Sequence, residues 1–181
     1  MSHDAFAAGI RLYLTGEREA ARHSFLKACD GGGYQYVCEA MAIWCQNGAE
    51  AGIKAVEMFD RAVGAGFIDL NYMPFLGLAA DKASRDKELP PLTRIALTQV
   101  AIDALRLSSE LSGAVRRRVE ERDGEVLAYR LAVCEHELPR LQRKFAEDYR
   151  SYQSLQLRHL DLAKGRVETS LSILRELLES S

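Results

Sequence analysis

The sequence predicts an all-α protein in which a short α-solenoid of helix-turn-helix units precedes long C-terminal helices. Three observations lead to this prediction. A pattern of small and aromatic residues recurs after 34 residues, glycines follow each copy, and the pattern does not return after Gly113. A fixed period of this length is typical of stacked helical repeats, because one unit buries its apolar face against the next.

The recurring pattern describes one face of a helix. Each copy places an alanine, a phenylalanine and an alanine at positions i, i+4 and i+7, which share a helical face. The small residues let a neighbouring helix approach closely, and the phenylalanine fills the space between them. Glycines then end the helix, since glycine adopts the left-handed cap conformation without steric cost. The two copies are Ala21, Phe25 and Ala28 with Gly32, and Ala55, Phe59 and Ala62 with Gly66.

A second apolar helix is expected before each of these helices. In the first unit it covers residues 6–14 and is followed by a turn at Gly16. A third unit is indicated by Leu76 and Gly77, which stand two periods of 34 residues after Ala8 and Gly9. Its second helix departs from the pattern, because Thr93 occupies the phenylalanine position. We therefore predict two regular units and one degenerate unit.

These residues resemble the tetratricopeptide repeat and, more closely, its glycine-terminated relative, the Sel-like repeat. In the second unit Ile43 replaces the glycine of the first helix. The resemblance implies a curved stack of helical hairpins, and the alternative is an irregular helical bundle in which the repetition is a coincidence. The residues of the first unit that match the small, turn and aromatic positions of the family are Gly9, Gly16, Ala21, Phe25 and Ala28.

The repeats are expected to occupy residues 1–105, and residues 106–181 to form a C-terminal helical hairpin or extension. One helix is predicted over residues 114–137, and Pro139 suits the first turn of a last helix that runs to Leu178. These helices either cap the open end of the stack or pair with a second copy of the chain, giving a homodimer. The apolar side chains of the last helix recur in steps of threes and fours, as one face requires; they are Tyr149, Tyr152, Leu160, Ala163, Val167, Leu171, Leu174 and Leu178.

The composition argues against nucleic-acid and membrane partners. Of 181 residues, 24 are cations and 26 are anions, and neither half of the chain is polarised in charge, so a nucleic-acid interface is not expected. No apolar run approaches the ~20 residues of a membrane span, and the N-terminus lacks the apolar core of a secretory signal. The four unevenly spaced cysteines suit free thiols in a reducing compartment, so a cytoplasmic location is expected.

The sequence offers little that points to catalysis. The glycines at 31–33 lack the lysine and serine or threonine that follow a phosphate-binding loop. Cys134 and His136 stand two residues apart, and such side chains diverge on a helix. We expect no catalytic residues, no cofactor and no metal. An enzyme or metal protein that uses Cys134 and His136 is a distant alternative.

The resemblance implies that the first helices of the units line a concave groove that binds a peptide or helix of another protein. A non-catalytic adaptor, chaperone or inhibitor is therefore expected, with aromatic residues such as Trp44 as its anchors. Two alternatives stay open. The chain's own C-terminal helix fills the groove and makes Trp44 part of the core, or the repeats are a scaffold whose C-terminal helices mediate self-association or docking. The predicted partner-binding residues are Phe6, Ile10, Tyr13, Val37, Trp44, Asn47, Leu78 and Lys82.

Overall fold

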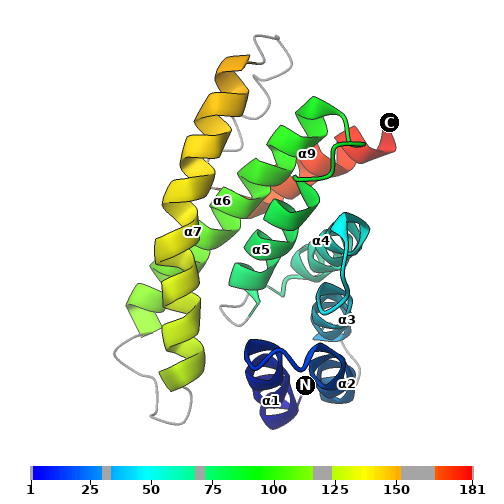
Figure 1. Ribbon diagram of the computed structural model, residues 1–181, viewed down its shortest axis with the longest axis vertical. Coiled ribbons are helices and arrows are strands. Elements are labelled where there is room, and N and C mark those ends of the chain that lie inside the picture. The colour runs from blue at the N-terminus through cyan, green and yellow to red at the C-terminus, as the bar shows by residue number, and fades with distance from the viewer. Residues whose placement is uncertain (1, 30–33, 68–71, 116–123, 152–165, 181) are drawn as a thin grey trace.

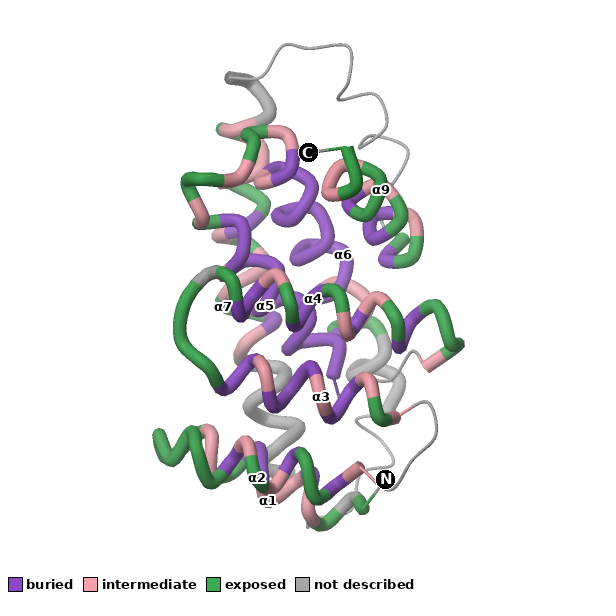
Figure 2. Tube along the Cα trace, turned by 90° about the vertical axis from the view of Figure 1, so that its right-hand side faces the viewer, coloured by how far each residue is buried: buried purple, intermediate pink, exposed green. Residues whose placement is uncertain are grey.

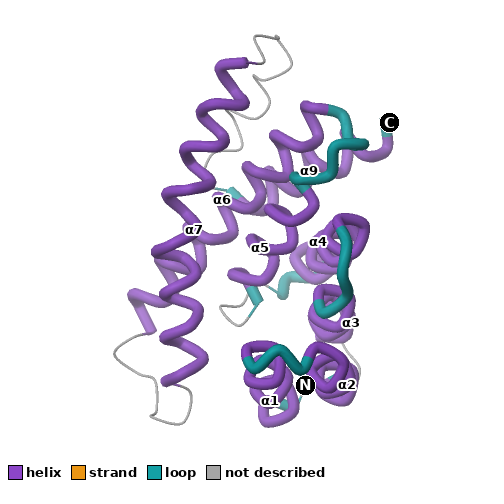
Figure 3. The backbone as a smooth tube through the Cα atoms, viewed as in Figure 1, coloured by secondary structure: helices purple, strands orange, loops and turns teal. Residues whose placement is uncertain are grey.

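The computed structural model describes residues 2–29, 34–67, 72–115, 124–151 and 166–180. Within these ranges the secondary structure is entirely helical, so the prediction of an all-α protein is confirmed (Figure 3). No helix in these ranges is both long and apolar enough to cross a membrane. The helices are α1 (His3–Leu14), α2 (Arg18–Ala28), α3 (Tyr34–Trp44), α4 (Ala49–Gly64), α5 (Met73–Ala83), α6 (Pro91–Val115), α7 (Gly124–Ser151) and α9 (Val167–Glu179).

From α1 to α7, each helix packs against the next one in the chain (Figure 1). α1 pairs with α2, α3 with α4, and α5 with α6, which gives three successive hairpins. The hairpins are joined by contacts of α2 with α3 and of α4 with α5. α7 packs on α6 and more lightly on α5, and α9 packs on α6 and more lightly on α4.

Glycines end two of these helices in the same way. Gly16 follows α1 with a φ of 86°, and Gly66 follows α4 with a φ of 83°. In both places the next backbone N–H returns to a carbonyl in the last turn, from Glu17 to Leu12 and from Phe67 to Ala62. This pairing satisfies carbonyls that the end of a helix would leave free, and it needs a left-handed residue, which glycine supplies without strain.

The two copies of the repeated pattern both lie in the core. Phe25 and Phe59 are fully buried, as are the alanines on either side of each. Figure 2 shows buried and exposed segments alternating along the helices of the hairpins. Their ring partners differ. Phe25 meets Phe6 of its own hairpin edge to face, with centroids 5.4 Å apart, whereas Phe59 stacks on Tyr72 at 5.5 Å, just before the next hairpin.

Gly9 and Gly77 mark close approaches between the two helices of a hairpin. A Cβ atom on Gly9 would lie 2.6 Å from a ring carbon of Phe25, and one on Gly77 would lie 2.9 Å from Cγ of Leu105. The first-helix glycine thus has the same packing role in the first and third hairpins. Gly77 nevertheless contacts Leu105, and not Thr93, which the period aligns with Phe25. The reason is that α6 starts late, after Pro90, and is longer than α2.

α6 is the central helix of the C-terminal part. All residues from 95 to 105 are buried, because α5, α7 and α9 pack around it. It runs through residue 105, so the predicted boundary between repeats and extension falls inside one helix.

The predicted limits of the C-terminal helices are wrong. Ala114 lies in α6, and α7 continues through Pro139. A proline within a helix removes one hydrogen bond; α7 nevertheless continues past it, and Cys134 and Leu141 are buried on either side. Arg166 has extended backbone (φ −125°, ψ 100°), so no continuous helix reaches from 139 to 178.

The apolar face predicted for the last helix agrees with α9 over its own length. Val167, Leu171 and Leu174 are buried and Leu178 is half-buried, where α9 lies against α6 and α4. These are the second helices of two hairpins, so α9 covers that side of the stack rather than the side of the first helices. The other residues predicted on this face, Tyr149, Tyr152, Leu160 and Ala163, lie outside the described side chains.

Candidate partner-binding site

Four of the eight predicted groove residues, Phe6, Ile10, Val37 and Trp44, belong to the buried core. Phe6, Ile10 and Val37 are 3%, 1% and 1% exposed, respectively. The ring of Phe6 packs on Phe25, as described above, and all three side chains contribute to one continuous apolar cluster. They present almost no surface through which a partner could be bound.

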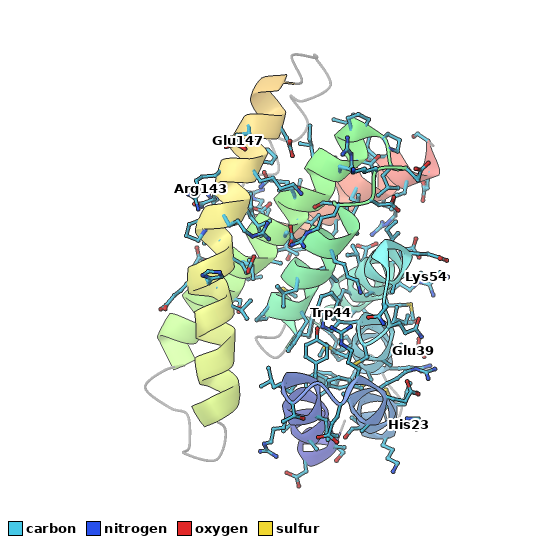
Figure 4. The ribbon with its side chains drawn as sticks, viewed as in Figure 1. His23, Glu39, Trp44, Lys54, Arg143 and Glu147 are labelled. Carbon is cyan, nitrogen blue, oxygen red and sulfur yellow. The ribbon has the colours of Figure 1, made fainter. Side chains whose placement is uncertain are left out.

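At the edge of this core, Trp44 meets two other predicted residues, each from a different hairpin. The rings of Tyr13, at the end of α1, and Trp44, at the end of α3, lie 6.0 Å apart. The Lys82 ammonium group, near the end of α5, lies 5.0 Å from the Trp44 ring centroid (Figure 4 labels Trp44). Leu78 lies one turn earlier on α5 and is half-buried.

Arg18 completes this cluster. Its guanidinium carbon lies 5.9 Å from the Tyr13 ring centroid, and the guanidinium donates a hydrogen bond to the side-chain carbonyl of Asn47. Lys82 donates a hydrogen bond of 2.8 Å to the backbone carbonyl of Gln46. We call the set Tyr13, Arg18, Trp44, Asn47 and Lys82 the aromatic patch.

Sequence reasoning missed Arg18 because it considered only the first helix of each unit. Arg18 opens α2, the second helix, directly after the turn at Gly16. The signal that could have identified it is its distance of five residues from Tyr13 across a tight turn, which returns the chain to the end of the helix it has just left.

The aromatic patch is cationic and partly exposed. Arg18 and Asn47 are exposed, Tyr13 and Lys82 are half-buried, and Trp44 is 9% exposed. Within the described part of the chain, neither Arg18 nor Lys82 has a carboxylate at salt-bridge distance. Burial lowers the pKa of Lys82, and the neighbouring Arg18 lowers it further. Two cations held this close to aromatic faces favour an acceptor of negative charge.

Burial also affects the pKa values of two weak acids here, Tyr13 of the patch and the neighbouring Cys45. It raises the pKa of the Tyr13 hydroxyl, which the Arg18 charge partly offsets. It raises the pKa of the Cys45 thiol to about 11. The Trp44 indole N–H lies beside the Tyr13 hydroxyl but makes no hydrogen bond of good geometry with any described residue. The positive charges of Arg18 and Lys82 therefore lie next to neutral side chains, Tyr13 and Cys45, and next to the unpaired indole N–H of Trp44.

The residues of the alternative metal or enzyme hypothesis lie apart on α7. Cys134 is buried, and burial raises the pKa of its thiol, whereas His136 is exposed. No group of three or more His, Cys, Asp or Glu side chains in the described ranges is arranged to hold a metal ion.

Comparisons of the chain with protein-family models, with curated proteins and with solved structures each gave no match.

Proposed function

We propose that the chain is a non-catalytic protein-interaction module that binds a peptide or helix of another protein at the aromatic patch. The observation that carries the proposal is the meeting of Tyr13, Trp44 and Lys82, which come from three successive hairpins. Tyr13 is half-buried and lies on the buried Trp44; an aromatic side chain held on a rigid frame in this way is a common anchor of interfaces. An adaptor, chaperone or inhibitor acting in the cytoplasm fits such a surface.

We further infer that the three hairpins are tetratricopeptide-like or Sel-like repeats, the third of them degenerate. Two features support this inference: the equal burial of Phe25 and Phe59, and the matched packing of Gly9 and Gly77. In this arrangement the ends of α1, α3 and α5 lie along one edge of the stack, and the patch occupies that edge.

The charge of the patch indicates the chemistry of the partner. Arg18 and Lys82 have donors left for a carboxylate, and the Tyr13 ring offers an apolar surface beside them. We expect the partner segment to carry an acidic side chain next to an apolar or aromatic one. An interface of ordinary size would bury about 800 Å² on each side, so residues around the patch would contribute as well.

The test reverses the charge of the patch without touching its core. Arg18→Glu combined with Lys82→Glu should reduce capture of the partner from cell extract at least ~10-fold, because opposite charges at an interface become like charges. The matched control is Arg11→Glu with Lys27→Glu, which changes exposed cations of α1 and α2 outside the patch. Circular dichroism should show equal helicity. Equal capture by both double variants would rule out the patch as the binding site.

The second candidate assigns binding or homodimer formation to the C-terminal helices. It is favoured by a cavity of about 520 Å³ between α4 and α9, whose apolar wall includes Val56, Leu174 and Leu178. In the same capture experiment, Leu178→Glu would abolish binding under this candidate and leave it unchanged under the first. The molar mass of the purified chain, measured at several concentrations, detects a homodimer directly.

A further inference from the structure

A second cationic region lies just beyond the C-terminal end of α5, where the chain turns into α6 and meets α7. There the structure forms a partly open cavity of about 300 Å³. Its lining includes four cations, one carboxylate and one serine, which are Arg85, Lys87, Arg94, Lys144, Asp148 and Ser84. Pro91, the first residue of α6, also lines it, so the positive end of that helix dipole adds to the potential.

Hydrogen bonds and ion pairs fix the frame of this cavity. Asp81 of α5, whose side chain is 4% exposed, pairs with Arg85 and, at 2.6 Å, with Arg140 of α7. Lys144 donates a hydrogen bond of 2.7 Å to the Ser84 hydroxyl, which in turn donates to the Asp81 carbonyl. Arg85 is therefore held by Asp81, which does not line the cavity, and Lys144 by Ser84, which does.

Asp81 pairs with Arg85, but part of the positive charge around the cavity is not neutralised by the described part of the chain. Lys144 and Lys87 have no carboxylate at salt-bridge distance among the described residues. The Nε of Arg94 is buried and has no hydrogen-bond partner there. Burial lowers the pKa of Lys144; Asp81 and Asp148 oppose this, and Arg85 and Arg140 add to it. Several cations around one space are unfavourable unless an anion fills it.

We propose that this cavity binds a small phosphate-bearing anion, either inorganic phosphate or the phosphoryl group of a small ester. Arg94 and Lys144 supply the charged donors from α6 and α7, and Arg85 and Lys87 close the site from the end of α5. A phosphate dianion matches a lining of four cations and one carboxylate, and its several oxygens accept from both guanidinium and ammonium groups. The volume lies at the lower end of ligand sites, which favours a phosphate or a small ester.

Direct titration of the full-length chain tests the proposal. Isothermal titration calorimetry with inorganic phosphate, and separately with glycerol phosphate, is performed at pH 7.5 and low ionic strength, against sodium chloride of equal ionic strength. We expect saturable binding of one phosphate group per chain. Tighter binding of glycerol phosphate than of phosphate would assign the site to an ester, and equal binding would assign it to the phosphate group alone. No heat above the chloride control for either anion would overturn the proposal.

Neutral variants of similar length locate the site. Arg94→Met and Lys144→Met should each weaken binding about tenfold or more, since each removes a charged donor. The matched control is Arg143→Met, an exposed cation next to Lys144 on α7 that does not line the cavity (Figure 4). Lys87→Met changes an exposed side chain that no core contact needs, so it remains informative if the other two unfold; it should weaken binding about threefold. Equal affinity of Arg143→Met and the cavity variants would contradict this location.

Discussion

The first two hairpins and the C-terminal helices are packed by different kinds of interaction. In the hairpins α1–α2 and α3–α4, alanines and aromatic rings make the contacts, as around Phe25. α7 and α9 add charged and polar groups that cross between helices: Asp81 with Arg140, Asp103 with Ser170, and Asp60 with Arg175. The apolar contacts come from a pattern that repeats along the chain, whereas each polar contact is made once.

This difference has an energetic consequence. Apolar packing loses stability in proportion to the atoms removed and the cavity left behind. A buried polar contact loses stability because its remaining partner stays buried without a hydrogen bond. The two halves should therefore respond to different substitutions, and the largest response is expected where the apolar contacts are densest.

The largest predicted effect is in the repeated core. Phe25→Ala and Phe59→Ala should each lower the free energy of unfolding by about 3–5 kcal/mol, because both rings are fully buried. Leu26→Ala, next to Phe25 and 43% exposed, is the matched control and should lose less than about 1 kcal/mol. Urea unfolding followed by circular dichroism measures all three. A large loss for one phenylalanine and a negligible loss for the other would show that the two positions are not equivalent.

A smaller effect is predicted where α9 packs on α6. Ser170 donates a hydrogen bond to Asp103. The Asp103 side chain is buried and also accepts a hydrogen bond of 2.9 Å from the Gln99 side chain. Ser170→Ala should cost about 1–3 kcal/mol, since a hydrogen bond to a buried carboxylate is lost. Ser172→Ala, exposed on the same helix, should cost almost nothing.

Hydrogen exchange separates a local from a global effect of Ser170→Ala. If the polar contact holds α9, amide protection should fall in α9 and persist in α1 to α4. An equal fall of protection in all helices would mean that α9 and the hairpins unfold as one unit, and the contrast between the two halves would lose its basis.

The part of the fold that could be predicted from the sequence is the part whose contacts repeat. The spacing of alanine and phenylalanine around Phe25 and Phe59 predicted two buried helical faces, and both are buried. Gly66 was predicted to end a helix, and it follows the end of α4 with a positive φ. These features are local, because helical spacing and cap geometry depend on a few neighbouring residues.

The features that could not be predicted depend on residues far apart in the sequence. Pro139 looked like a helix start, but helix continues on both sides of it in α7. Asp81 and Arg140 are 59 residues apart, and no periodicity relates them.

The aromatic patch lies between these extremes. Tyr13, Trp44 and Lys82 were predicted from the register of the repeats and do meet, whereas Arg18 was missed. Phe6, Ile10 and Val37, predicted from the same register, lie in the core, and Trp44 is buried as well. Register gives the helix on which a residue lies, but the depth of its side chain depends on how closely the neighbouring hairpin packs.

The smallest predicted effect uses alkaline pH to distinguish the two halves. Burial holds the pKa of the Cys45 thiol at about 11 in the folded chain, above its ordinary value of 9.0. Between these values the unfolded chain releases a proton that the folded chain keeps, so rising pH favours unfolding. The expected loss from Cys45 between pH 9 and 11 is about 1 kcal/mol, reduced from the full change in pKa because nearby solvent screens the charge.

Only the difference between variants assigns this loss to Cys45. Burial raises the pKa of Cys134 on α7 as well, so the wild type combines a contribution from each half. Above pH 9 the unfolding free energy of Cys45→Ala should decline less steeply than that of the wild type. The same comparison with Cys134→Ala measures the contribution of the C-terminal half. The ion pairs of Arg140 and Arg175 keep their charge in this range, since their carboxylate partners hold the pKa of both guanidinium groups above its usual range. Alkaline pH should therefore act on the thiols, on Tyr13 and on the two lysines of lowered pKa, Lys82 and Lys144, and leave the ion pairs of Arg140 and Arg175 intact. Identical slopes for Cys45→Ala and the wild type would mean that Cys45 ionises as freely in the folded chain as in the unfolded one.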